Sequence, residues 1–530
     1  MNEKREKQKE EEKVNKDRKL RSETIILRPE VPLLERLSTY AASDAYPFHM
    51  PGHKRQVKMG ITSVPNPFSV DITEIDGFDN LHHAEGLIRE AEERAAKLYG
   101  ADRSYYLVNG STCGLLAAIC AAARRGDKVL AARNCHKAVY HAVSMQGLSV
   151  EFLYPAITRG DLQGQITAAQ VEEALTKHPD IAVVILTSPT YEGIVSDVAA
   201  IAACCHAHGA ALIVDEAHGA HFGFGAGFPE NAVRLGADAV IMSLHKTLPS
   251  FTQTALLHCN GGRIDTERVA RYLGVYETSS PSYLFMAGMD ACIDLIREQG
   301  AELFAQYRRR LDAFYRDTAD LTQLRVMRRE DLCKEEAYDW DDSKLMIYAG
   351  TMGGEALHQE LLGHYHLQME MVSADYVLGM TSLMDTDEGM RRLVTALHEI
   401  DEKNGRRMAA LHEIDEKNRC MAALRGTDEE NRRLDAPEAG FTARMYRENP
   451  RRMQIYQALD LPYREVPFDE AVGKMAADYV YLYPPGIPLI VPGEIITEEF
   501  IRHIRECRER KLNVEGQGNL ALGRIKIVYF

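Results

Sequence analysis

From about residue 84 to residue 259 the chain alternates short apolar runs with segments whose apolar positions recur at helical spacing. Short apolar runs bounded by turn residues predict buried strands. The expected strands cover residues 104–108, 128–132, 181–187, 211–215, 238–243 and 254–259. The expected helices cover residues 84–98, 112–123, 136–145 and 196–208. This alternation predicts βαβ units and an α/β fold built on a mostly parallel sheet.

Beyond about residue 320 the pattern changes to that of a smaller α+β unit. Strands are expected at residues 345–349, 368–372 and 376–380. One long amphipathic helix is expected over 393–424, and it contains the sequence LHEIDEKN twice, at 397–404 and 411–418. The offset of 14 residues (411 − 397) is close to four helical turns, so both copies place their apolar positions on roughly one face. We interpret the duplication as a local helix extension, because two copies are too few for a solenoid.

The chain begins with a strongly charged segment. Its first 21 residues hold nine Lys or Arg, six Asp or Glu and almost no apolar side chain. This composition predicts a flexible tail and lacks the apolar core of a signal peptide. The predicted organisation is a charged tail at 1–22, a major domain at 23–320, a small α+β domain with the duplicated helix segment at 321–418, a charged linker at 419–451 and a C-terminal domain at 452–530.

Composition limits the classes of function. Hydrophobic residues make up 45% of the 530 residues and charged residues 27%, which is typical of globular proteins and excludes collagen, disulfide-scaffold and mainly disordered chains. No apolar run approaches the ~18 residues of a transmembrane helix, so no membrane partner is expected. The net charge of −15 argues against a nucleic-acid partner. The ten cysteines form no CxxC pair, and without an export signal they predict reduced thiols and a cytoplasmic location.

Polar side chains follow three of the predicted strands at the point where each strand ends. Ser111 and Thr112 follow the first strand named above. Asp215 ends the fourth strand, and Lys246 comes three residues after the fifth. Parallel strands present their carboxyl ends at one edge of a sheet, which is where open α/β sheets bind ligands. Three polar groups that converge there predict a functional site.

Each of these groups has a structural alternative. The segment Gly110-Ser111-Thr112 opens a helix, so it forms either an anion cradle or a plain helix N-cap. Asp215 binds a cationic ring nitrogen or a metal, or caps the next turn. Lys246 is either an amine nucleophile, since burial readily removes its charge, or a strand-end lysine whose head reaches solvent. A phosphate cradle, a ring-nitrogen acid and a Schiff-base lysine are together what pyridoxal phosphate requires.

Seven motifs carry a resemblance to a known family. They are HMPGHK at 49–54, LVNGST at 107–112, RNCHK at 133–137, DEAH at 215–218, SLHK at 243–246, TSSPSY at 278–283 and YPPGIP at 483–488. In this order they resemble the bacterial ornithine/lysine/arginine decarboxylases, which are fold-type-I pyridoxal-phosphate enzymes. The resemblance implies an aspartate-aminotransferase-like α/β major domain that binds the cofactor, with smaller α+β domains after it. The long enzymes of that family carry an additional N-terminal receiver-like domain, and this chain resembles the short form.

The resemblance implies roles for individual residues. Lys246 would hold the cofactor through a Schiff base, Asp215 would keep the ring nitrogen protonated, and His136 would stack on the ring. His245 would touch the phosphate or donate a proton to the substrate Cα. The other implied cofactor-binding residues are Ser111, Thr112 and Ser243 around the phosphate, together with Ala217 and His218.

The resemblance also implies one residue that acts in a neighbouring subunit and one that binds the substrate. Thr278 would reach the phosphate of a neighbouring subunit, so the resemblance implies a homodimer or larger homo-oligomer with shared sites. Glu494 would lie near the distal cation of a basic amino acid. The alternative for Glu494 is a surface carboxylate before a helix, where acidic residues are favoured.

The implied reaction is decarboxylation of arginine, lysine or ornithine, in that order of expectation, in polyamine biosynthesis. The alternative is an aminotransferase or another amino-acid lyase, which the fold alone does not separate. Fold-type-I aminotransferases usually hold the substrate α-carboxylate with a C-terminal arginine, and residues 481–491 contain none. A decarboxylase should not clamp that carboxylate, because its charge must leave as CO2.

Two other motifs do not lead to a site. The sequence GFGAGF at 223–228 does not match the GxGxxG of dinucleotide-binding proteins and does not join a strand to a helix. Cys204 and His208 fall on one helix face, but two ligands do not close a zinc site, so no metal is expected.

Overall fold

The computed structural model describes residues 32–56, 66–425, 440–483, 486–510 and 512–529, and for residues 408–425 it describes only the helical backbone. The predicted tail at 1–22 lies outside the described residues. Residues 426–439 of the predicted linker also lie outside them, as do Pro484 and Pro485 of the YPPGIP motif.

A seven-stranded sheet forms the centre of the molecule, in the order β2-β9-β8-β7-β5-β3-β4. Strand β9 pairs antiparallel with β2 and β8, and the remaining pairs of this sheet are parallel. The strands are β2 (Arg103–Leu107), β3 (Lys128–Ala132), β4 (Ser149–Leu153), β5 (Ile181–Thr187), β7 (Ala211–Asp215), β8 (Ala239–Met242) and β9 (Ala255–Cys259). The predicted α/β fold with a mostly parallel sheet is confirmed.

Helix α4 (Gly110–Ala122) packs across this sheet, against strands from β2 to β5 in the sheet order. Gly114 allows the close approach, because a Cβ at this position would lie 2.6 Å from Leu107 Cδ1. The other helices of this part of the chain are α2 (Leu33–Ala41), α3 (Leu87–Tyr99), α5 (Lys137–Gln146), α6 (Ala168–Lys177), α7 (Val198–Ala207), α8 (Leu244–Thr247), α9 (Thr266–Tyr276) and the 35-residue α10 (Tyr283–Asp317). The sequence patterns predicted neither β4 nor α6 nor α10.

The smaller α+β unit is built on the antiparallel sheet β10-β12-β15-β14. Its elements are β10 (Arg325–Val326), β12 (Lys344–Tyr348), α11 (Gly354–Gly363), β14 (Met371–Val372) and β15 (Tyr376–Met380). The strand predicted at 368–372 is two strands, because β13 (Leu367–Met369) pairs instead with β1 (Tyr46–Phe48). A further short pair joins β6 (Ile194–Val195) to β11 (Asp339–Trp340), and thereby ties this unit to the major domain.

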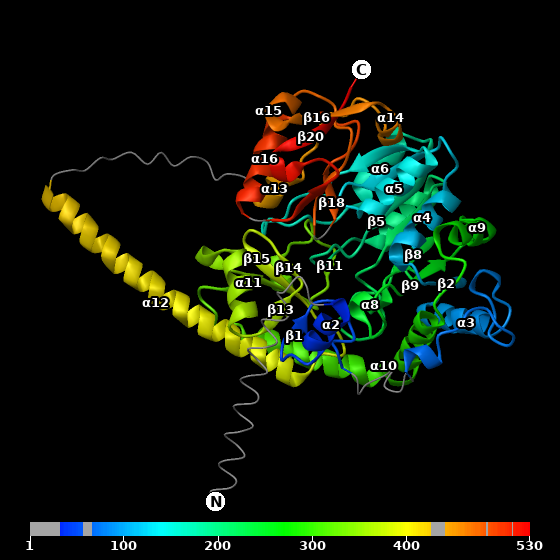
Figure 1. Ribbon diagram of the computed structural model, residues 1–530, viewed down its shortest axis with the longest axis horizontal. Helices are drawn as coiled ribbons and strands as arrows, with labels where there is room; N and C mark the ends of the chain where they lie inside the picture. Colours follow the sequence, from blue (N-terminus) through cyan, green and yellow to red (C-terminus); the bar gives the residue numbers. More distant parts are fainter. Residues whose placement is uncertain (1–31, 57–65, 426–439, 484–485, 511, 530) are drawn as a thin grey trace, which may run out of the picture.

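Helix α12 (Asp387–Arg425) contains both copies of the duplicated segment. It starts before the predicted residue 393, and it continues past residue 418, where the sequence pattern placed the beginning of a linker. Figure 1 shows that its far end projects away from the rest of the protein. The duplication therefore lies in a continuous helix whose first part packs on the small unit and on α10.

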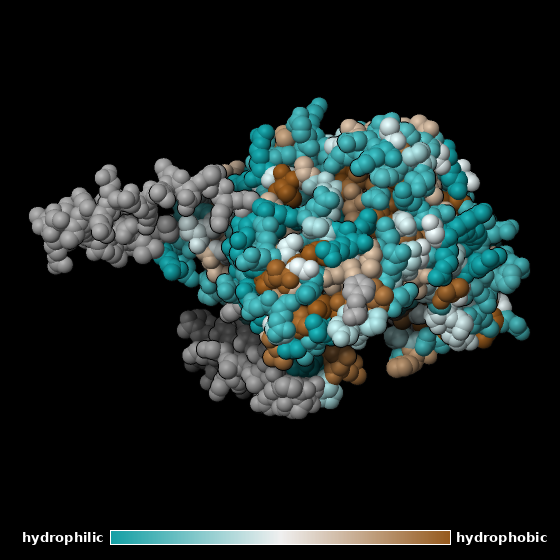
Figure 2. Space-filling view, turned by 90° about the horizontal axis from the view of Figure 1, so that it is seen from above, coloured by the Kyte–Doolittle hydropathy of each residue, from teal (hydrophilic) through white to brown (hydrophobic). Residues whose placement is uncertain are grey.

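The C-terminal part has its own apolar core and lies beside the major domain (Figure 1). Its elements are α13 (Phe441–Met445), α14 (Ile455–Leu459), β16 (Tyr463–Pro467), α15 (Phe468–Ala471), β17 (Val480–Leu482), β18 (Ile487–Ile490), α16 (Glu498–Glu509), β19 (Val514–Gly516) and β20 (Arg524–Val528). Figure 2 shows a face that is mainly hydrophilic, with smaller hydrophobic patches between. Among the helices in the described ranges, none has the length and apolar character needed to cross a bilayer.

Candidate active site

A cavity of about 290 Å³ opens where β5, β7 and β8 end. Nine of the eleven residues singled out from the sequence line it. These nine are Ser111, Thr112, His136, Asp215, Ala217, His218, Ser243, His245 and Lys246. The expectation that polar groups converge at this sheet edge is therefore met by the geometry. Thr278 and Glu494 do not line this cavity.

The first turn of α4 forms one wall of the cavity. Asn109, which precedes the helix, makes no side-chain capping bond, so it satisfies none of the N–H groups of that turn. Ser111 and Thr112 lie inside the helix rather than at its cap. Ser111 Oγ is 2.7 Å from Ser243 Oγ, so hydroxyls from two elements meet beside this helix end. Gly110 N donates to Gln253 O at 2.9 Å, and the N–H groups that follow it, the helix dipole and the paired hydroxyls together suit a phosphate.

Asp215 ends β7 and is 3% exposed. Its Oδ1 accepts a hydrogen bond of 3.2 Å from Ala217 N, which fixes the carboxylate direction. Burial raises the pKa of Asp215, while the nearby Lys246 acts in the opposite direction. Since no ion pair within 4.0 Å engages Asp215 in the described part of the chain, its buried carboxylate is suited to binding a protonated ring nitrogen, and the two charges would then compensate each other.

Two histidines of the cavity have defined tautomers. His136 caps α5 and its Nδ1 accepts from Ala138 N at 3.2 Å, so the neutral ring carries its proton on Nε2. His245 Nδ1 lies 2.9 Å from the carbonyl oxygen of Thr254 and must donate to it, which leaves Nε2 as the acceptor. Burial lowers the pKa of His136 to about 3 and that of His245 to about 4. Both rings are therefore neutral at pH 7.

A chain of hydrogen bonds joins Lys246 to a second buried lysine. Lys246 Nζ lies 3.0 Å from His218 Nε2, and His218 Nδ1 lies 3.1 Å from Lys344 Nζ. Lys344 opens β12 in the small sheet and has 0% exposure. Burial lowers the pKa of Lys344 to about 8, while the nearby carboxylate of Asp341 acts in the opposite direction. Lys344 is therefore mainly an ammonium group at pH 7.

This arrangement sets the protonation of the ring between the two lysines. An ammonium group donates and cannot accept, so His218 Nδ1 must accept from Lys344. Burial lowers the pKa of His218 well below its usual value, so the neutral ring carries its single proton on Nε2. That proton points at Lys246 Nζ, which must then be an unprotonated amine to accept it. Burial also lowers the pKa of Lys246, which favours the neutral, nucleophilic form.

Glu494 is buried against an arginine of this chain. It is 1% exposed, and its Oε2 lies 3.4 Å from Arg133 Nη2 and accepts from Val491 N at 3.0 Å. It is neither a carboxylate of the cavity nor the surface carboxylate of the alternative interpretation, because Arg133 draws it into the interior. Thr278 is exposed, and its carbonyl oxygen accepts from His82 Nε2 at 2.9 Å.

Three residues that the sequence analysis did not single out belong to this region. Glu192 and Tyr191 line the cavity, and Lys344 lies behind it. Glu192 follows β5 by five residues, at the same sheet edge as Asp215, so the rule that identified Asp215 would also have found it. Lys344 begins a strand of another sheet, and no local pattern connects it to His218.

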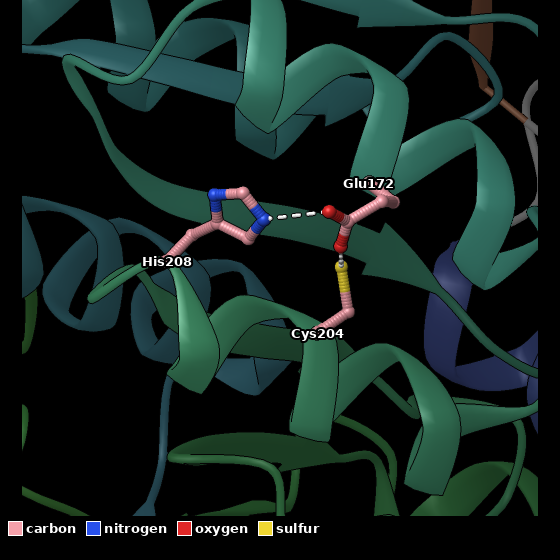
Figure 3. Close-up of side chains that lie close together, drawn as sticks. All are labelled: Glu172, Cys204 and His208. Carbon is pink, nitrogen blue, oxygen red and sulfur yellow. Dashed lines mark hydrogen bonds and ion pairs between the residues drawn. The ribbon is translucent and has the colours of Figure 1, made fainter.

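Cys204 and His208 lie on one face at the end of α7, and Glu172 of α6 adds a third donor (Figure 3). Cys204 Sγ donates to Glu172 Oε2 at 3.1 Å, and His208 Nε2 donates to Oε1 at 3.0 Å. The three groups are each other's hydrogen-bond partners, so a polar clamp between α6 and α7 accounts for their position. Sequence reasoning missed Glu172 because it lies 32 residues before Cys204.

The residues of the cavity fit pyridoxal phosphate. They provide an anion site at α4, a buried carboxylate at Asp215, a neutral ring at His136 and an uncharged amine at Lys246. Asn134 Oδ1 is buried, lines the same cavity region and has no hydrogen-bond partner among the described residues, so a polar ligand would satisfy it. The cavity therefore has a group suited to the phosphate, a group suited to the ring nitrogen and a group suited to the aldehyde carbon of the cofactor.

Comparison with known proteins identifies the family. The family model for the Orn/Lys/Arg decarboxylase major domain matches residues 31–338, and that for the C-terminal domain matches residues 442–516. The chain is 33% identical to the protein YaaO of Bacillus subtilis, over 92% of this chain and 96% of that one. It is 30% identical to an arginine decarboxylase of Halalkalibacterium halodurans, over 94% and 98%.

Solved structures agree on the fold. A lysine decarboxylase of Francisella novicida superposes with a TM-score of 0.71 at 19% identity, covering 87% of this chain and 75% of that one. The constitutive lysine decarboxylase of Escherichia coli gives a TM-score of 0.69 at 20% identity, covering 94% and 81%. The chain belongs to the Orn/Lys/Arg decarboxylase family, and it is a pyridoxal-phosphate-dependent decarboxylase of a basic amino acid.

Proposed function

We propose that this enzyme decarboxylates arginine, in preference to lysine and ornithine, and that Lys246 holds its cofactor. The relatives of similar length that are about 30% identical over nearly the whole chain are named arginine decarboxylases, which supports arginine. The observation that carries the site is the convergence of Lys246, Asp215, His136 and the hydroxyls beside α4 in one cavity. The product of arginine decarboxylation is a polyamine precursor, so we also propose a role in polyamine biosynthesis in the cytoplasm.

The positions of the cavity residues support a role for each of them. When bound, pyridoxal phosphate supplies a cationic ring that accepts the electron pair left at Cα as CO2 departs. Asp215 would hold the proton on the ring nitrogen, and His136 would lie beside the ring. Ser111, Ser243 and N–H groups of the first turn of α4 would hold the phosphate.

The hydrogen bonds that connect Lys246, His218 and Lys344 support the proton positions that we propose next to Lys246. His218 donates its Nε2 proton to Lys246 Nζ and so directs the lone pair of that nitrogen. Lys246, as an unprotonated amine, would be the residue that holds the cofactor. His245, whose Nδ1 is committed to Thr254, has only Nε2 available to deliver a proton to Cα.

The test is release of CO2 from arginine, lysine and ornithine, each with and without added pyridoxal phosphate. Cofactor-dependent release that is fastest with arginine supports the proposal. Borohydride treatment followed by peptide mapping should place the cofactor on Lys246. Labelling of another lysine would contradict the site, and transfer of the amino group without CO2 release would favour an aminotransferase.

We also propose a homodimer whose sites include Thr278 of the neighbouring subunit. Thr278 is exposed and lies away from the cavity of its own chain, as a residue with a role in the other chain must. An apolar groove of about 400 Å³, lined by Ile72, Phe78, Phe251 and Leu284 among others, lies on the same side of the chain as α10. A second copy would cover this groove, since exposed apolar patches commonly mark interfaces.

A further inference from the structure

The cavity contains one carboxylate whose position suits the far end of a substrate. Glu192 lines the cavity of Lys246, and it also lines a second cavity of about 40 Å³ that reaches toward the small sheet and the C-terminal part. Gln163 and Tyr483 are the other residues common to both. Glu192 therefore lies at the junction through which a side chain extending from the cofactor would pass.

This carboxylate has no cationic partner in the described part of the chain. No Lys, Arg or His nitrogen of those residues forms an ion pair with it within 4.0 Å. Its hydrogen-bond partners are neutral: Tyr376 Oη donates to Oε1 at 3.3 Å, and the side chain of Thr190 and the backbone of Glu192 also contact the carboxylate. Burial raises the pKa of Glu192, with the charge of Lys344 acting weakly in the opposite direction. A partly buried carboxylate in this state is stabilised by a cation that enters the cavity.

The neighbouring carboxylates are already engaged. Glu370 accepts from Tyr191 Oη and, at 2.8 Å, from Met50 N. Asp215 faces Lys246 and the predicted position of the ring nitrogen. Glu494 is paired with Arg133 outside the cavity. Among the described residues, Glu192 is thus the carboxylate of the cavity that remains for a ligand.

The backbone of Glu192 is held firmly, so its side chain is presented from a fixed point. Trp340 Nε1 donates to the carbonyl oxygen of Glu192 at 2.9 Å. The next residue, Gly193, has a φ of +99°, and a Cβ there would lie 2.8 Å from the carbonyl oxygen of Asp341. Tyr191, Tyr376 and Tyr483 line the two cavities that share Glu192, and tyrosine faces also attract cations.

We propose that Glu192 binds the distal cation of the substrate and makes the enzyme selective for basic amino acids. The inference rests on the proposed function for the identity of the site, and it adds the residue that recognises the side chain. Binding the distal cation of the substrate would also restrict the torsion about the Cα–N bond. Decarboxylation requires a torsion at which the departing carboxylate is perpendicular to the plane of the ring. Glu192 is accordingly a binding residue with a secondary effect on turnover.

The test uses ligands that cannot be decarboxylated. Calorimetry on the holoenzyme compares 1,5-diaminopentane and agmatine, which carry a distal cation, with 1-aminopentane, which lacks one. Wild type should bind the dications about 10- to 100-fold more tightly, the range expected for a charge-assisted hydrogen bond. Glu192→Gln should lose most of this preference while retaining the cofactor absorbance. Glu494→Gln is the matched control and should keep the preference.

The outcomes are distinguishable from those that test the proposed function. An unchanged preference in Glu192→Gln, or no preference in wild type, would overturn the role of Glu192, even if CO2 release from arginine is fast. If Glu192→Gln does not fold, Glu192→Asp retains the charge on a side chain shorter by one methylene, and it should weaken binding of the dications without changing that of 1-aminopentane. Equal weakening of all three ligands in Glu192→Asp would overturn the role too.

Discussion

Replacing Glu494 with Gln separates two interpretations of this residue. In the structure Arg133 donates to Pro488 O at 2.6 Å and to Tyr140 Oη at 3.2 Å, and its remaining arm faces Glu494. Both side chains of the pair are almost fully buried, at 4% and 1% exposure. Arg133 directly follows β3 of the major domain, whereas Glu494 and Pro488 belong to the C-terminal part. The ion pair therefore connects these two parts of the protein.

The expected magnitude follows from the charge that the substitution leaves behind. Removing one partner of a buried pair costs about 3–5 kcal/mol, because the other charge stays buried without compensation. Gln can still accept from Val491 N and Asn449 Nδ2, so we expect the lower end, about 3 kcal/mol. The double variant Arg133→Met/Glu494→Met leaves no buried charge and should be more stable than Glu494→Gln.

The assay is urea unfolding of wild type, Glu494→Gln and the double variant, followed together with KM for arginine. We expect a lower unfolding midpoint for Glu494→Gln and a KM within about twofold of wild type, since no binding interaction worth ~1.4 kcal/mol is lost. The reasoning is refuted if Glu494→Gln unfolds at the wild-type midpoint and raises KM tenfold or more. Glu494 would then act in the substrate pocket, as the resemblance alone implied.

Three further outcomes are expected. Asp215→Asn should bind the cofactor, measured by its absorbance, and lose at least about 100-fold in kcat, since the ring nitrogen is no longer held protonated; near-normal turnover would remove this role. Lys344 has a pKa of about 8 when folded against an ordinary value of 10.5, so it is neutral in the folded chain but charged in the unfolded chain between these pH values. Lys344 should therefore contribute a rise in wild-type stability with pH across that window of up to about 3 kcal/mol, and denaturant unfolding of Lys344→Met should show a smaller rise than wild type, since the buried Lys246 and Lys54 remain. Mixing inactive Lys246→Ala and Thr278→Ala subunits should restore part of the activity through hybrids with one intact site, and proven subunit exchange without recovery would contradict a shared site.

Local rules were enough for much of the site. Asp215, Ser243 and Lys246 could be placed because each follows a strand closely, and the carboxyl ends of parallel strands share one edge. Their side chains face the same cavity for that reason alone. The strand at 211–215 was predicted with the observed bounds, since five apolar or strand-ending residues leave little freedom in a fully buried position.

Other features depended on contacts between distant residues. The single strand expected at 368–372 is divided at Glu370, whose carboxylate turns inward to Tyr191 and Met50. These partners lie 179 and 320 residues away, so no window of sequence contains the cause. Lys344 is similar, because its contact with His218 joins a turn after β7 to a strand of a different sheet.

Charge balance explains why we propose Glu192, rather than Glu494, as the carboxylate that binds the distal cation. A carboxylate is available to a ligand only if the chain itself supplies no cation for it, and the sequence does not show which cation lies beside which acid. Arg133, in the RNCHK motif, forms a buried ion pair with Glu494. Asp215 and Glu192 line the cavity, and a complex of cofactor and basic substrate would bring two cations that suit them, the ring nitrogen and the distal group. The proposed phosphate site is the first turn of α4, so under this proposal each charge that enters the cavity is matched by a group of opposite charge or dipole.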